Sequence, residues 1–196
     1  MYRKVEDIYG MPSSDKRNYA SLNLDFIRQR WDQKAESWEQ DLRNEDFHLN
    51  EDKAYERFII HAIGVINSRR ELCQNSSLLD VGCGTGLVLQ RLIPYFRDAT
   101  GIDISLKMLD QVRKKNIPNV QLLEGNCFKL NSNLKQFGAI VSRGILLSHY
   151  GEQLAIPFLT GIYNMTQKDG FSLIDFLNAD ARYLYKSTPN NKTYYM

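Results

Sequence analysis

Apolar residues in the first third of the chain recur at helical spacing. Over residues 25–42 they fall three or four positions apart, which is the pattern of one face of an amphipathic helix. A similar set over residues 55–66 predicts a second helix, ending near residues 68–70, and the polar stretch 44–52 separates the two. We therefore expect helices ahead of the first strand that could cover a site formed by later elements.

From residue 77 onward the pattern changes to short apolar runs that alternate with helical stretches. Short, continuous apolar runs are typical of buried parallel strands, and strands separated by helices imply right-handed βαβ units. Ser105 is expected to cap the helix after the second strand, with Leu106, Leu109 and Val112 on its apolar face, and Pro157 weakens the last helix. The expected strands are 77–81, 99–104, 120–124, 137–141 and 171–176, and the expected helices are 86–96, 106–115 and 150–166.

Three glycines at alternate positions, Gly82, Gly84 and Gly86, follow the first of these strands directly. A glycine has no Cβ and tolerates positive φ, so such a turn lets a ligand approach the backbone. The N–H groups at the start of the following helix suit an anionic or carboxylate-bearing ligand. Because ligands of open parallel sheets bind beyond the carboxyl ends of the strands, we expect the site here.

Two acids near this turn indicate which ligand it binds. Asp103 ends the second strand, about 20 residues further on, where a carboxylate can bind both hydroxyls of a ribose. Asp80 lies just before the glycines, where it would repel a pyrophosphate and attract an ammonium group. The glycine spacing also departs from the G-x-G-x-x-G of dinucleotide sites. These residues favour S-adenosylmethionine over NAD, and a nicotinamide-dependent oxidoreductase is the alternative.

Composition narrows the class of protein further. Lys and Arg number 25 and Asp and Glu 23, a net charge of +2 that lacks the basic excess of nucleic-acid-binding proteins. The start shows no signal peptide, and no apolar run is long enough to span a membrane. The three cysteines (Cys73, Cys83, Cys127) show no paired spacing, so we expect reduced thiols in a cytoplasmic protein. Neither they nor the histidines (His48, His61, His149) have the spacing of zinc ligands, so we expect no metal site.

Several segments resemble motifs of class I S-adenosylmethionine-dependent methyltransferases, in the small-molecule branch. The resemblance covers roughly residues 28–180 and implies an α/β fold with a Rossmann-like, doubly wound, mostly parallel sheet of order 3-2-1-4-5. It also implies transfer of a methyl group to a small-molecule acceptor, with neither nucleic acid nor membrane as partner. The segments are 31–38 (the N-terminal lid of that branch), 78–86, 100–105 and 124–128 (the first three motifs) and 137–142 (the strand before the active site).

The resemblance implies roles for individual residues. The glycine turn would hold the methionyl part of the cofactor, Asp103 the ribose, and Asn126, where the family usually has an acid, the adenine amine. The tryptophans, cysteines and methionine of this set have a second interpretation as core side chains. The expected cofactor-binding residues are Trp31, Trp38, Asp80, Gly82, Cys83, Gly84, Gly86, Asp103, Ile104, Met108, Asn126, Cys127 and Ser142.

His149 and Tyr150 follow the fourth strand, where contacts with the acceptor are expected. A general base is needed only if the acceptor is an alcohol, a phenol or an acidic carbon. His149 is then the candidate base and Tyr150 could orient the substrate. The alternative for His149 is a structural hydrogen bond at the start of a helix.

We expect one compact domain, with residues 1–50 as an N-terminal helical lid or cap and residues 51–196 as the cofactor-binding part. Family members usually end with a further helix and an antiparallel strand pair, and the residues after Asp175 are too few for both. We therefore expect the pair to be missing or truncated, or the sheet edge to be closed by a partner such as a second copy in a homodimer. A noncatalytic nucleoside-binding or assembly domain stays open for the same reason.

Overall fold

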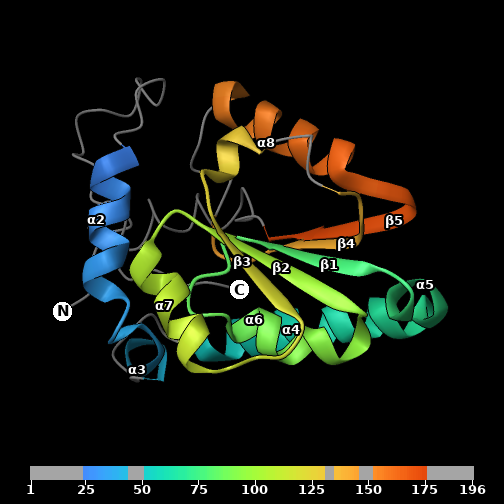
Figure 1. Cartoon of the computed structure of the whole chain (residues 1–196), viewed down its shortest axis with the longest axis horizontal. Helices are drawn as coiled ribbons and strands as arrows, with labels where there is room; N and C mark the ends of the chain where they lie inside the picture. The colour runs from blue at the N-terminus through green and yellow to red at the C-terminus, as the bar shows by residue number, and fades with distance from the viewer. Residues whose placement is uncertain (1–23, 44–50, 131–134, 146–151, 176–196) are drawn as a thin grey trace, which may run out of the picture.

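The computed structural model describes residues 24–43, 51–130, 135–145 and 152–175 of the 196-residue chain. Within them, five parallel strands form one sheet in the order β3-β2-β1-β4-β5 (Figure 1). This order and direction confirm the doubly wound α/β fold expected from the sequence. The strands are β1 (Ser77–Val81), β2 (Asp98–Asp103), β3 (Val120–Glu124), β4 (Phe137–Ser142) and β5 (Thr166–Ile174).

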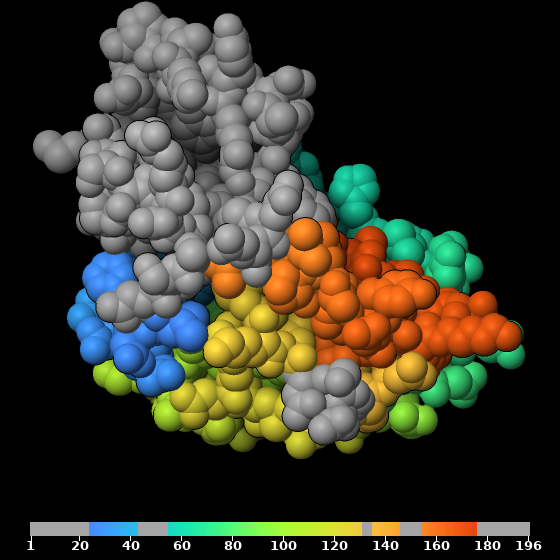
Figure 2. Space-filling view, turned by 90° about the horizontal axis from the view of Figure 1, so that it is seen from above, coloured from blue at the N-terminus to red at the C-terminus, as the bar shows by residue number. Residues whose placement is uncertain are grey.

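Helices cover both faces of the sheet (Figure 1), and Figure 2 shows α8 in orange over one of them. The N-terminal helices α2 (Leu24–Lys34) and α3 (Trp38–Arg43) lie at the side of the sheet, with α2 against α7. One face carries α4 (Glu51–Ser68), α5 (Arg70–Gln74), α6 (Leu87–Leu92) with the 3-10 turn η2 (Ile93–Tyr95), and α7 (Leu106–Lys114), and the other carries η3 (Cys127–Lys129) and α8 (Glu152–Met165).

The central strand β1 is buried along its whole length. Leu78 packs into the hydrophobic cluster formed with α4, α6 and α7, whereas Leu79 and Val81 pack into the cluster formed with α8. A strand buried on both faces needs apolar residues at consecutive positions, which explains the run in the sequence. Asp80, at 1% exposure, is the ionisable residue of this strand, and a buried carboxyl group needs a functional or structural reason.

The helix predicted over residues 25–42 is two helices in the structure, separated by a turn at residues 35–37. The Ser37 N–H donates to the Lys34 carbonyl at 3.2 Å, and the Ser37 hydroxyl donates to Asp41 Oδ2 at 3.0 Å. The Ser37 carbonyl accepts from the Asp41 N–H at 2.7 Å, so a new helix begins directly after Ser37. The apolar periodicity continues across the turn, so it did not indicate the break.

The fifth strand begins at Thr166, well before the predicted residue 171. Its polar first part pairs with Phe137, and after a shift in register Phe171 pairs with Ala139. Asp169 within this part has a φ of 64°. A bulged, polar strand start lacks the apolar pattern on which the prediction relied.

Three helix predictions were also wrong in detail. The helix after the glycine turn ends at Leu92 instead of residue 96, because Pro94 lacks an N–H and lies in the 3-10 turn η2. Helix α4 begins at Glu51, inside the stretch predicted to be a polar break, and α5 follows it. Leu106 is 45% exposed, and Met108 takes the buried position on α7 that was expected for it.

Candidate functional site

A pocket lies at the carboxyl end of β1, under the N-terminal helices. Elements far apart in the sequence contribute to it: α3, α4, the glycine turn, the start of α6 and the end of β4. This is the edge of the sheet where the sequence analysis expected a ligand. The pocket is lined by Trp38, Tyr55, Asp80, Gly82, Cys83, Gly84, Thr85, Leu87, Val88 and Arg143.

The glycines of the turn serve two different purposes. Gly82, Gly84 and Gly86 all have positive φ, at 75°, 53° and 81°. A Cβ placed on Gly86 would lie 3.0 Å from the Val112 side chain, so this glycine allows close packing against α7. A Cβ on Gly84 would meet no described atom within 4 Å. Gly84 is therefore the position at which a ligand can approach the backbone.

Asp80 is a buried carboxylate whose Oδ2 has no hydrogen-bond partner in the described part of the chain. Burial raises the pKa of Asp80 to about 8, with a further increase from the charge of Asp103 and an opposing hydrogen bond from the Leu89 N–H. The hydroxyl of Thr85, also a pocket residue, is a second buried polar atom without a described partner. Because unpartnered buried polar atoms are costly, this pair indicates a polar ligand.

Asp103 is held at the end of β2 by the backbone on both sides of the site. Its Oδ2 accepts from the Gly84 N–H at 2.8 Å, and its Oδ1 accepts from the Ser105 N–H at 2.9 Å. Burial raises the pKa of Asp103, although these hydrogen bonds oppose the increase. Each oxygen has a second lone pair, so the carboxylate can still accept from two ligand hydroxyls.

Two other expected cofactor residues are built into the fold. The Ser142 hydroxyl donates to the Val81 carbonyl at 3.0 Å, and the Ser142 carbonyl accepts from the Asp175 N–H at 3.2 Å. Asn126 Oδ1 accepts from the Phe128 N–H at 2.9 Å and so caps η3. The contacts of Ser142 and Asn126 with a ligand stay predictions.

Met108 and Cys83 are buried and Cys127 is half-buried, and the contacts of these three residues with a cofactor stay predictions. Met108 is 2% exposed and packs as a core side chain on α7. Burial raises the pKa of Cys127 to about 12 and also raises that of Cys83, so neither side chain is a thiolate at neutral pH. Ile104 is half-buried beside Asp103, which leaves part of its surface for a ligand.

The two tryptophans contact each other edge to face, with ring centroids 5.2 Å apart at an angle of 86°. Trp38 lines the pocket, and the Lys34 ammonium group lies 5.8 Å from the centroid of its ring. The structure therefore brings Trp38 to the site and places Trp31 against it. The roles of both in binding a cofactor stay predictions.

Arg143 follows β4 at the strand end where a site was expected, but its cluster with Tyr55 and Asp175 was not predicted. The Arg143 guanidinium stacks 4.4 Å from the centroid of the Tyr55 ring, and its Nη1 lies 3.0 Å from Asp175 Oδ2. The other oxygen of Asp175 accepts from the Gly144 N–H at 3.0 Å. The rule that found Asp103, an acid at the end of a strand, could have found Asp175. No sequence signal points to Tyr55.

The remaining expectations concern the proposed base, a metal site and a membrane-spanning helix. His149 and Tyr150 lie outside the described residues, so the proposed base stays a prediction. Among the described residues, no group of His, Cys, Asp or Glu is placed to hold a metal ion. In the same part of the chain, no helix has both the length and the apolar character needed to cross a bilayer.

Comparison with known proteins connects this site to a family. Residues 78–170 match the family model described as a methyltransferase domain. The dTDP-3-amino-3,4,6-trideoxy-alpha-D-glucopyranose N,N-dimethyltransferase of Streptomyces venezuelae is 35% identical over 98 residues, which cover 49% of this chain and 39% of that protein. The probable cobalt-precorrin-6B C(15)-methyltransferase of Archaeoglobus fulgidus is 40% identical over 62 residues, or 32% of this chain and 38% of that protein. The chain thus spans well under two thirds of either relative.

Solved structures share the fold. The DhpI complex with SAM and HEP has a TM-score of 0.65 at 13% identity, covering 87% of this chain and 74% of that one. Streptomyces venezuelae DesVI has a TM-score of 0.56 at 23% identity, covering 74% and 56%. Residues 78–170 thus match a methyltransferase family model, and the strand order is the one expected for the class I S-adenosylmethionine-dependent methyltransferases whose motifs the sequence resembles.

Proposed function

We propose that the chain binds S-adenosylmethionine at the glycine turn and transfers its methyl group to a small-molecule acceptor. The observation that carries the proposal is the buried Asp80 carboxylate, with an oxygen that no described residue satisfies. A carboxylate in this position complements an ammonium group and opposes a pyrophosphate. It supports an amino-acid-bearing nucleoside rather than a dinucleotide, and neither relative described above is an oxidoreductase.

The residues at this edge of the sheet fit the parts of that cofactor. Asp80 and Thr85 offer a carboxylate and a hydroxyl to its amino-acid end, and Gly84 leaves space for close approach. Asp103 offers two carboxylate oxygens to the ribose, and Ile104 an apolar surface to the adenine. When bound, the sulfonium supplies an activated methyl group.

The main contribution of the chain to the reaction is then to hold the cofactor and the acceptor in the correct relative position. The glycine turn is held in place because the Gly82 N–H donates to the Ile102 carbonyl at 2.8 Å and the Gly84 N–H donates to Asp103. Trp38 and Tyr55 line the pocket on the side of α3 and α4. Holding two reactants in line can lower a barrier by about 7–11 kcal/mol, so such rigidity is a sufficient catalytic device.

We further propose an amine as the first acceptor to test. The Streptomyces venezuelae relative and a Streptomyces fradiae relative, 29% identical over 106 residues, are named as N,N-dimethyltransferases of dTDP-linked amino sugars. A neutral amine attacks with its own lone pair, whereas an alcohol would need a base such as His149.

We place the protein in the cytoplasm. Cys73, Cys83 and Cys127 are all free thiols, which is typical of reducing compartments. The net charge of +2 supports a small molecule rather than a nucleic acid as the partner.

Isothermal titration calorimetry with S-adenosylmethionine, S-adenosylhomocysteine and NAD tests the cofactor. We expect both sulfur nucleosides to bind and NAD not to bind. Asp103→Ala should weaken nucleoside binding tenfold or more, because two hydrogen bonds to the ribose are lost. Asp98→Asn, at the opposite edge of the sheet, is the matched control and should bind normally. A wild-type chain that binds neither sulfur nucleoside would refute the proposal.

Turnover with labelled cofactor then tests the acceptor and the base. Amino sugars linked to a nucleotide come first, followed by a metabolite extract. If the acceptor found is an alcohol or an acidic carbon, His149→Ala should lower kcat by about 10²–10⁴-fold and leave the affinity for S-adenosylhomocysteine unchanged. Unchanged turnover on such an acceptor would remove the assignment of His149 as the base.

A further inference from the structure

Asp32, on the N-terminal helix α2, contacts the first turn of α7. Its Oδ1 accepts from the Ser105 hydroxyl at 2.6 Å and lies 3.4 Å from the Lys107 N–H, which also donates to it. The same Ser105 oxygen accepts from the Met108 N–H at 3.1 Å and so caps α7, as the sequence predicted. One serine hydroxyl therefore both starts α7 and holds α2 against it. Figure 1 shows α2 beside α7.

Ser105 also connects this contact to the cofactor site. Its N–H donates to Asp103 Oδ1 at 2.9 Å, and Asp103 Oδ2 accepts from the Gly84 N–H at 2.8 Å. A continuous set of hydrogen bonds thus runs from Asp32 through Ser105 and Asp103 to the glycine turn. Ser105 is fully buried and Asp103 is 9% exposed, so water competes little for these groups.

Besides the contacts of Asp32, helix α2 makes an edge-to-face contact between Trp31 and Trp38 and an ion pair of Arg28 with Glu124 at 4.0 Å. None of its residues is buried. The following helix is anchored better, since Leu42 is buried and Glu39 forms an ion pair with Lys115 on α7 at 2.6 Å. An element that buries few apolar side chains opens at low free energy, so the hydrogen bonds from Ser105 and Lys107 to Asp32 influence whether α2 is docked.

We infer that Asp32 is a positioning residue for the nucleoside half of the cofactor site. With α2 docked, Asp32 holds Ser105, and Ser105 holds the Asp103 carboxylate in the orientation that its ligand needs. The inference rests on the proposed function, because it takes a nucleoside to be the ligand of Asp103. Binding of the nucleoside then stabilises docked α2, and docked α2 strengthens binding by the same factor, as thermodynamic linkage requires.

The test compares Asp32→Ala and Asp32→Asn with the wild-type chain and with Glu36→Ala, an exposed acid of the same segment. Calorimetry with S-adenosylhomocysteine measures affinity, and amide hydrogen exchange of residues 24–34 measures docking of α2. In the wild-type chain the nucleoside should slow exchange in α2. Asp32→Ala should bind about tenfold more weakly and lose most of this protection, whereas Asp32→Asn, which still accepts from Ser105, should keep much of both. Glu36→Ala should match the wild type.

A double-mutant cycle with Ser105→Ala separates positioning from general destabilisation. If Asp32 acts through Ser105, removing Asp32 from a Ser105→Ala chain should have much less effect on affinity than removing it from the wild type. Effects that simply add would contradict the inference, as would an Asp32→Ala chain that binds and protects normally. Either result, with a wild-type chain that binds the nucleoside, leaves the proposed function standing. A wild-type chain that does not bind it overturns both.

Discussion

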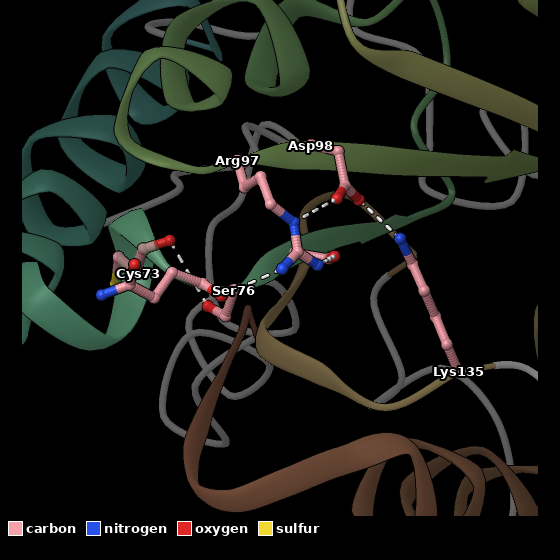
Figure 3. Close-up of polar contacts among 7 residues, drawn as sticks. Cys73, Ser76, Arg97, Asp98 and Lys135 are labelled. Atoms are coloured by element: carbon pink, nitrogen blue, oxygen red, sulfur yellow. Dashed lines mark hydrogen bonds and ion pairs between the residues drawn. The ribbon is translucent and has the colours of Figure 1, made fainter.

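At the scale of single residues, two aspartates at opposite edges of the sheet show how surroundings set charge. Burial raises the pKa of Asp80 to about 8. Burial also raises the pKa of Asp98, but hydrogen bonds from Lys135, Ser77 and Arg97 outweigh it and lower the value to about 2. Figure 3 shows Asp98 between Arg97, at 3.0 Å, and Lys135, at 2.5 Å. Asp98 is thus kept ionised by cations of the chain itself, whereas the buried Asp80 has no such partner among the described residues and keeps a high pKa.

Asp80 predicts that folding stability falls as the pH rises. Its folded pKa of about 8 lies above the unfolded value of 3.8, so between these values the folded chain holds a proton that the unfolded chain has lost. The free energy of unfolding should decrease there by up to about 1.4 kcal/mol per pH unit from this group. Urea unfolding at several pH values should show a shallower decrease for Asp80→Asn. Equal slopes for the two chains would contradict the pKa assigned to Asp80.

At the scale of elements, the sequence pattern predicted the bounds of those elements that depend on neighbouring residues in the sequence. The strands β1 to β4 begin and end within one residue of their predicted bounds, because buried parallel strands require continuous apolar runs. The cap by Ser105 was predicted because it depends on one side chain and the backbone next to it. The break at Ser37 and the early start of β5 depend on local hydrogen bonds and on pairing with a distant strand, which periodicity does not report.

Substitution by alanine should have different consequences at Gly84 and at Gly86. Gly84→Ala should cost about 1 kcal/mol of stability, because its φ of 53° is unfavourable for alanine, and should weaken S-adenosylhomocysteine binding because the Cβ enters open space. Gly86→Ala adds a contact with Val112 at 3.0 Å to a similar strain and should destabilise the fold more. Thermal unfolding and calorimetry on both variants measure these effects. Normal binding by Gly84→Ala would show that the ligand does not approach the backbone there.

At the scale of the whole molecule, the part of the site that sequence could predict is the part that is local in sequence. Asp80 and the glycine turn are contiguous, and Asp103 ends the next strand, so topology brings these residues together. Tyr55, Arg143 and Asp32 reach the site or its supports through helix packing and side-chain orientation. Those depend on the core as a whole, and a single sequence does not specify them directly.

The placement of the aromatic residues has a spectroscopic consequence. The chain has two tryptophans, and both belong to the N-terminal helices, where their indoles lie 5.2 Å apart at nearly a right angle. Indoles so close are excitonically coupled, and they give a paired band in the far-ultraviolet circular dichroism whose sign and size depend on that geometry. The large sheet domain contributes no indole at all. Selective excitation of tryptophan therefore observes the N-terminal helices alone, and the native chain carries its own optical probe of their movement.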